Sequence, residues 1–141
     1  MIELITPISY WILTVLWLII LGLYLVKLKA IRAAGGAVAI LLIILAIDAF
    51  RTVFESVYFG FYFNSLFGLL PKGIHQVLSQ PILLIIPKLI NIFAGLLVLF
   101  LLIRRWVPQE IREREKTLEE LQQSINSLKK KEATLNAIFE G

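Results

Sequence analysis

Residues 37–56 read AVAILLIILAIDAFRTVFES, an apolar run that ends in three charged side chains. With the residues just before it, the run is long enough for a helix that crosses a bilayer, which takes roughly 20 mostly apolar residues. Asp48, Arg51 and Glu55 are three and four residues apart, so a helix places them on one face, where the arginine can reach both carboxylates. The stretch therefore predicts a membrane helix that carries a charged stripe.

The composition of the whole chain is that of a membrane protein. Its 141 residues are 59% hydrophobic, and its mean hydropathy is +0.85. Three stretches, at about 8–28, 34–56 and 81–103, are apolar enough to span a bilayer. We therefore predict an all-α membrane protein with three transmembrane helices in residues 1–106. Residues 107–141 are rich in charge and form a separate cytoplasmic helix in this interpretation.

The basic residues predict the orientation of these helices. They follow the first span, at Lys27, Lys29 and Arg32, and the third span, at Arg104 and Arg105. Only Lys72 is charged in the loop between the second and third spans. Basic residues near the ends of spans mark the cytoplasmic side, so we expect the N-terminus outside and the C-terminus in the cytoplasm. The net charge of +4 is explained by this bias, and we expect the lipid bilayer, not nucleic acid, as the partner.

The loop between Pro71 and Pro81, KGIHQVLSQ, predicts a short helix at the outer membrane surface. Ile74, Val77 and Leu78 fall on one helical face there, as in a helix lying on a membrane. His75 is the only histidine, and the chain has no cysteine. One such ligand is too few for a metal site, so ligation of a metal or haem by His75 is the less favoured alternative. We predict no cofactor.

Depth along the helices predicts a partner for the charged stripe. A rise of 1.5 Å per residue puts Asp48 roughly 21 Å above the cytoplasmic side, and Lys88 of the third span roughly 22 Å above it. Asn91 lies about 18 Å up by the same count. We therefore predict an intramembrane charge network, with Lys88 as the counter-ion that faces the stripe: Asp48, Arg51, Glu55, Lys88 and Asn91. Unpaired charge at that depth costs at least a few kcal/mol per group.

Two hypotheses for this network remain open. It is either static polar glue between helices, or a switch with two arrangements in which Glu55, nearest the water, responds to protons.

Apolar residues in the last segment recur with a heptad period, and we call them the heptad stripe: Ile111, Leu118, Leu121, Ile125, Leu128, Leu135 and Phe139. Arg114 and Glu132 interrupt it. The period predicts a parallel dimeric coiled coil, with a single amphipathic helix as the alternative.

The order of segments resembles the input region of bacterial PAS-containing sensor proteins. It consists of spans without a sizeable outer domain, then RRW, a charged heptad helix and the closing LNAIFEG. Those families are histidine kinases and diguanylate cyclases or phosphodiesterases. The resemblance implies a homodimeric sensory and transmitter module in the bacterial inner membrane, joined to a downstream cytoplasmic output domain. Neither a phosphate loop, a nucleophile elbow nor metal-ligand spacing occurs, so we expect no catalysis by this chain itself. The alternative is a transport or channel subunit whose intramembrane charges line an ion or proton path.

Overall fold

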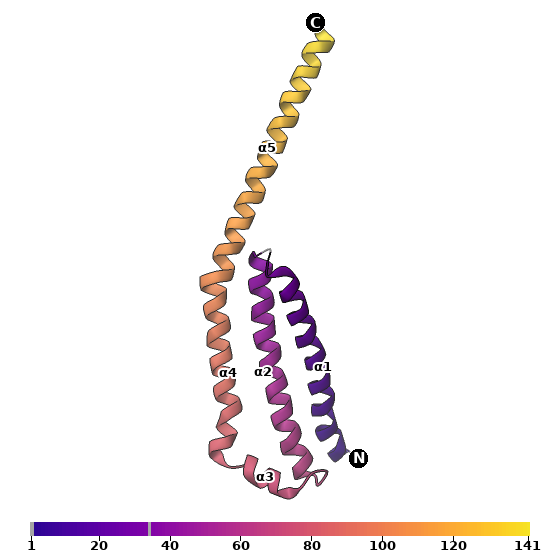
Figure 1. Cartoon of the computed structure of the whole chain (residues 1–141), viewed down its shortest axis with the longest axis vertical. Coiled ribbons are helices and arrows are strands. Elements are labelled where there is room, and N and C mark those ends of the chain that lie inside the picture. Colours follow the sequence, from indigo (N-terminus) through magenta and orange to yellow (C-terminus); the bar gives the residue numbers. More distant parts are fainter. Residues whose placement is uncertain (1, 34) are drawn as a thin grey trace.

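The computed structural model describes residues 2–33 and 35–141, with side chains from Leu4 onward (Figure 1). Every regular element in that part of the chain is helical. The elements are α1 (Ile2–Ile31), α2 (Ala37–Leu66), α3 (Lys72–Leu78), α4 (Pro81–Leu101), a π-helical segment η1 (Leu102–Trp106) and α5 (Val107–Glu140). Within the described residues, three helices are long and apolar enough to cross a membrane. The prediction of an all-α protein with three such helices is confirmed.

The second of these helices is longer than the predicted span 34–56. It begins at Ala37 because Gly35 and Gly36 adopt φ angles of 66° and 94°, a backbone conformation that few other residues reach without strain. It continues past the charged stripe to Leu66, through the aromatic segment that follows Glu55. The helix therefore carries both the stripe and an aromatic outer end.

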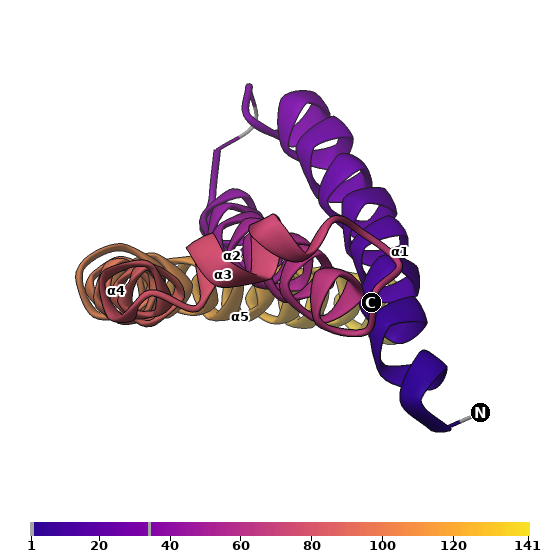
Figure 2. The ribbon, with the colours of Figure 1, turned by 90° about the horizontal axis from the view of Figure 1, so that it is seen from below.

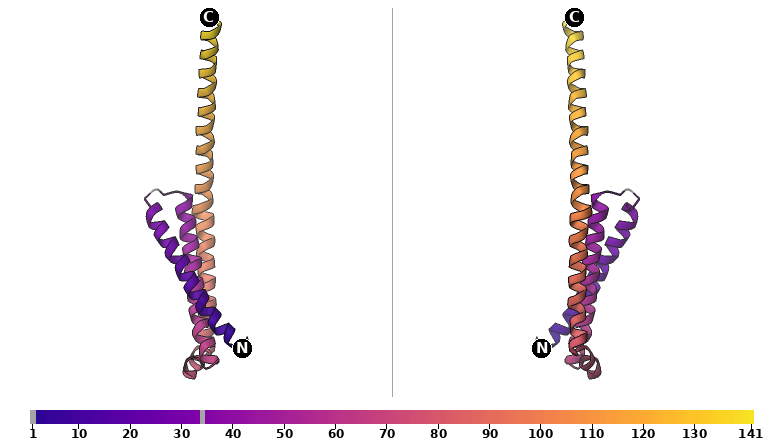
Figure 3. Two further views of the ribbon diagram at one scale, coloured as in Figure 1. Left: turned by 90° about the vertical axis from the view of Figure 1, so that its right-hand side faces the viewer. Right: turned by 90° about the vertical axis from the view of Figure 1, so that its left-hand side faces the viewer.

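α2 is the central helix of the bundle. Seen from the end, it lies between α1 and α4 (Figure 2). It packs along α1 and contacts α4, whereas α1 and α4 do not touch one another in the part of the chain that the structure describes. Side views show α1 diverging from α2 toward the turn that joins them (Figure 3). Within the described residues, α1 and α4 are therefore linked only through α2.

Aromatic rings hold α1 against the far end of α2. The ring of Tyr10 stacks on that of Phe63, with centroids 5.4 Å apart, and Trp11 meets Phe61 edge to face at 5.2 Å. Buried Asn64 donates hydrogen bonds to the carbonyl oxygens of Pro7 and Gly60, at 3.1 and 2.7 Å. Each aromatic pair of this kind contributes about 0.5–1.5 kcal/mol of stability beyond the burial of its surface. These contacts hold α1 and α2 together at this end of the bundle.

α4 continues into α5 without a break. The helical stretch from Pro81 to Glu140 is 60 residues long and includes η1, and its second half projects from the bundle (Figures 1 and 3). Pro87 lies inside α4 and does not end it. At 1.5 Å per residue the stretch measures about 90 Å. α4 and α5 are therefore parts of one long helical stretch.

Candidate functional site: the polar network between α2 and α4

Arg51 is the centre of a polar network on α2. Its Nη2 lies 2.8 Å from Oδ1 of Asp48, and its Nε donates to the same oxygen at 3.0 Å. Its Nη1 lies 3.5 Å from Oε2 of Glu55. The three and four residue spacings produce this geometry, because they put both carboxylates on the helical face of the guanidinium. Asp48 is thus held closely, and Glu55 more loosely.

Asn91 connects this network to α4. Its side-chain oxygen accepts a hydrogen bond from Nη1 of Arg51 at 3.2 Å, and its side-chain nitrogen donates to Oε2 of Glu55 at 3.4 Å. An amide suits this position because it offers a donor and an acceptor at once. One side chain of α4 therefore binds both the cation and one anion of α2.

Lys88 does not lie where the sequence predicted it. It is exposed on α4, and no ion pair joins it to any residue whose side chain the structure describes, 4–33 and 35–141. The face of α4 that meets α2 carries Pro87, Asn91 and Ala94. Lys88 is rotated by about 100° from Pro87 and by about 120° from Ala94, since each residue turns an α-helix by about 100°. It lies seven residues from the start of α4, within reach of the membrane surface for a long, flexible side chain.

The network without Lys88 contains two carboxylates and one guanidinium. Their side chains remain partly accessible, with exposed fractions of 50% for Asp48, 37% for Glu55 and 28% for Arg51. A space of about 380 Å³ borders Asp48, Arg51 and Asn91 on one side of the α2–α4 contact. The arrangement can hold two helices together, and a change of charge at Glu55 alters the bond to Asn91. Both hypotheses for the network therefore stay open.

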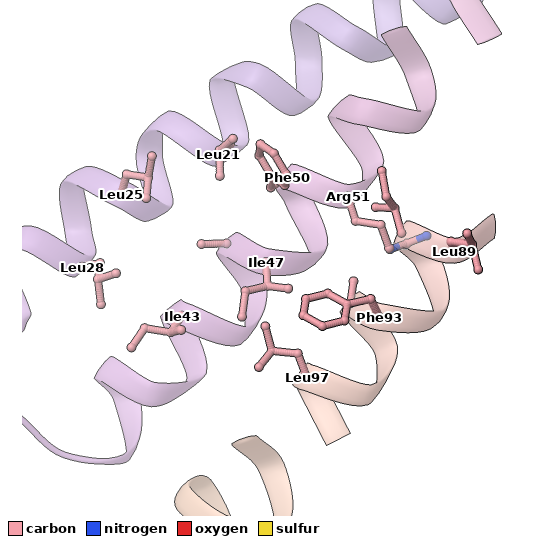
Figure 4. A pocket seen from close by; sticks show the side chains of 13 residues that line it. Leu21, Leu25, Leu28, Ile43, Ile47, Phe50, Arg51, Leu89, Phe93 and Leu97 are labelled. Carbon is pink, nitrogen blue, oxygen red and sulfur yellow. The ribbon is translucent and has the colours of Figure 1, made fainter. Parts of the chain in front are cut away.

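On the opposite side of Arg51 lies an apolar groove (Figure 4). It measures about 750 Å³ and has α2 as its floor, with α1 and α4 as its walls. Leucine and aromatic side chains line it, among them Leu21, Leu25, Phe50, Phe93 and Leu97. Arg51 is its charged member. The groove exists because α1 and α4 do not contact one another.

A second polar contact, which sequence reasoning missed, joins α5 to the start of α2. Oε1 of Glu113 accepts a hydrogen bond from the backbone N–H of Ala37 at 2.8 Å, and one from Nε2 of Gln109 at 3.0 Å. These two bonds lower the pKa of the Glu113 carboxyl below its usual value, the Gln109 bond having the larger effect. The N-terminus of a helix leaves backbone N–H groups unpaired and attracts negative charge. Glu113 therefore caps α2 from another helix.

The sequence indicates only that α2 lacks a cap of its own. Gly36 precedes α2 and has no side chain that could accept a hydrogen bond from the first N–H groups of the helix. The approach is close: a Cβ added at Gly36 would lie 2.8 Å from Oε1 of Glu113. The φ of 94° favours glycine at this position, and a larger residue would also have to displace the flexible end of the Glu113 side chain.

His75 lies in α3, with its ring centroid 4.7 Å from that of Tyr62. Its backbone N–H donates to Oγ of Ser65 at 2.9 Å, and Tyr58 donates to the carbonyl oxygen of Leu78 at 2.9 Å. These bonds hold α3 against the end of α2. Among the described residues no three His, Cys, Asp or Glu side chains gather as metal ligands would.

All seven residues of the heptad stripe lie exposed on α5. The structure of the single chain gives them no partner within the described residues, and α5 reaches the bundle only near its beginning, where Glu113 meets α2.

Comparisons with protein-family models, curated proteins and solved structures found no match to the chain. The interpretation of function consequently rests on the geometry described above.

Proposed function

We propose that the chain is the membrane sensory and transmitter module of a bacterial signal-transduction receptor. In this proposal a stimulus at the outer or intramembrane part shifts α4 relative to α2. The shift passes along α5, as part of a dimeric coiled coil, to an output domain in the cytoplasm. The observation that carries the proposal is the single helix from Pro81 to Glu140, which joins the polar network to the far end of α5.

Support also comes from the two contacts between this long helix and α2. Asn91 binds Arg51 and Glu55 within the apolar part, and Glu113 binds Ala37 at the end where α5 leaves the bundle. Two separated contacts fix both the position and the rotation of a helix. Breaking either one leaves the helix free to rotate about the other. Such a helix can take two arrangements, which is what a transmitter requires.

The proposed orientation places the N-terminus outside and α5 in the cytoplasm of the bacterial inner membrane. α1 ends, and η1 lies, at the end of the bundle from which α5 projects (Figure 1). The basic residues belong to these parts of the chain: Lys27, Lys29 and Arg32 at or just after the end of α1, and Arg104 and Arg105 in η1. Lys72 begins α3 at the other end. This distribution agrees with the preference of basic residues for the cytoplasmic side.

The experiment uses the whole chain in lipid vesicles and reads the position of α5. Spin labels at Ser127→Cys, the only cysteine in such a variant, report the distance between copies. Asn91→Leu removes the bridge between α2 and α4 and should shift or broaden the distance distribution. Lys88→Met, on the same helix without an ion-pair partner in the described residues, is the matched control and should leave the distribution unchanged.

An unchanged distribution in folded Asn91→Leu would reject transmission from this network. Ion or proton flux through the same vesicles, absent from vesicles without protein, would favour the transport alternative. Asn91→Ala serves in the same test if the leucine variant does not accumulate in membranes. Either result separates a transmitter from a conduction path.

A further inference from the structure

One face of α4 is apolar and exposed along its whole length. Every third or fourth residue from the start of the helix contributes to it: Ile82, Ile85, Leu89, Ile92, Leu96 and Leu99. Ile103 continues the same spacing. The exposed fractions of Ile92 and Leu96 are 60% and 61%. This face points away from Asn91 and Ala94, which meet α2.

The heptad stripe of α5 has the same alternation of three and four residues, beginning at Ile111. The two series are not simply continuous, however. Ile103 and Ile111 occupy the same place in the repeat but lie eight residues apart, where a heptad requires seven. In an unbroken α-helix the extra residue would offset the two series by about 100°.

The extra residue falls within the π-helical segment η1. Leu102–Trp106 is the one segment in the described residues with this geometry. A π-helical turn holds one residue more than an α-helical turn, because its hydrogen bonds run to the fifth residue instead of the fourth. η1 therefore absorbs the added residue and keeps the apolar face of α4 in register with that of α5.

We propose that a second copy of this chain packs in parallel against the face from Ile82 to Phe139, as one seam through the membrane and the cytoplasm. The inference deepens the proposed function and rests on its coiled coil. Lipid can cover the α4 part of the face, but not the α5 part, which projects into water. Copies inserted in the same orientation have parallel α5 helices. A three-and-four repeat also gives the left-handed crossing most common between membrane helices.

Adjacent leucines at the same depth provide the test. Leu96→Cys places a thiol in the proposed seam, whereas Leu97→Cys places one in the apolar groove toward α1, about 100° away. The chain has no native cysteine. On oxidation in membranes, Leu96→Cys should give about fivefold more disulfide dimer than Leu97→Cys, because a disulfide needs Cβ atoms about 4 Å apart. Leu128→Cys tests the α5 part in parallel.

The outcomes separate this inference from the proposed function. Dimer at Leu128→Cys with none at Leu96→Cys would retain the coiled coil and overturn the continuous seam, leaving lipid on α4. Absence of dimer at both positions would reject both. Equal dimer at Leu96→Cys and Leu97→Cys would indicate collision between copies and likewise overturn the inference.

The register of η1 provides a second, independent test. Deleting Arg104 removes the extra residue, so an ordinary α-helix then brings both series into register, and the crosslinks at Leu96→Cys and Leu128→Cys should both persist. Inserting one alanine after Arg105 adds another offset of about 100°, and one of the two crosslinks should be lost. Persistence of both crosslinks after the insertion would overturn the single seam.

Discussion

The carboxylate of Glu113 on α5 lies 2.8 Å from the backbone nitrogen of Ala37, the first residue of α2. The two residues are 76 positions apart in the sequence. A charged acceptor at a helix N-terminus both satisfies an unpaired N–H and interacts favourably with the helix dipole. The contact therefore joins the projecting helix to the central helix of the bundle at the place where the spans end.

We predict that Glu113→Gln weakens this cap. A neutral amide is a poorer acceptor and has no charge to interact with the dipole. Hydrogen exchange at the amides of Ala37 and Val38 should become faster. Glu115→Gln is the control, because it removes an equal charge from an exposed position two residues further along α5. Equal exchange in wild type and Glu113→Gln would mean that the cap does not stabilise the start of α2.

The same contact predicts a dependence on pH. The pKa of Glu113 is lowered by the bonds from Gln109 and Ala37. A carboxyl with a lowered pKa in the folded state stabilises that state above its ordinary pKa, and the stabilisation is lost as the pH falls through the lowered value. The amide nitrogen chemical shift of Ala37 should therefore titrate at acidic pH, below the usual range of a glutamate. In Glu113→Gln this titration should disappear; its persistence would assign it to another group.

The orientation of the bundle is tested by labelling from outside intact cells. Ser79 follows α3, and Ser127 lies in α5. With an impermeant thiol reagent, Ser79→Cys should be labelled on intact cells and Ser127→Cys only after the membrane is opened, because the proposed orientation puts the basic ends of the spans in the cytoplasm. The reverse pattern would invert the topology and leave the three spans intact.

The sequence predicted the helices better than their rotation. Runs of apolar residues and the spacing of Asp48, Arg51 and Glu55 determine which segments are helical and which three side chains share a face. α4 is apolar nearly all round, so its periodicity does not show which side meets α2. Depth alone could not separate Lys88 from Asn91, since the two lie within one turn. Tertiary packing of Pro87 and Ala94 against α2 makes the choice.

Contacts between distant segments were equally out of reach. Nothing in the heptad pattern around Glu113 distinguishes its carboxylate from the other acidic groups of α5. The glycines before α2 indicated a helix without its own cap, but not which residue would supply one. The π-helical geometry of η1 depends on how two helices of different register are joined, which the residues LIRRW do not reveal by themselves.

The last prediction concerns which cation holds Asp48. Because Arg51 is 2.8 Å from Asp48 while Lys88 forms no ion pair within the described residues, the substitutions Asp48→Asn and Arg51→Met should be strongly coupled. Removing Arg51 alone leaves two carboxylates without a cation inside the bilayer, at a cost of a few kcal/mol. Removing the Asp48 charge as well relieves part of that cost. The free energy of unfolding of the double variant should therefore be about 0.5–3 kcal/mol higher than the sum of the two single effects predicts.

The pair Asp48→Asn and Lys88→Met is the matched control. Since these side chains do not pair, their effects on the free energy of unfolding in bicelles should add within about 0.5 kcal/mol. Coupling of Asp48 to Lys88 instead of Arg51 would place α4 in a different rotation, with Lys88 toward α2. That rotation would also turn Asn91 and the exposed face of α4, so the crosslink at Leu96→Cys would have to weaken with it. The two experiments therefore test the same helix rotation from opposite faces of α4.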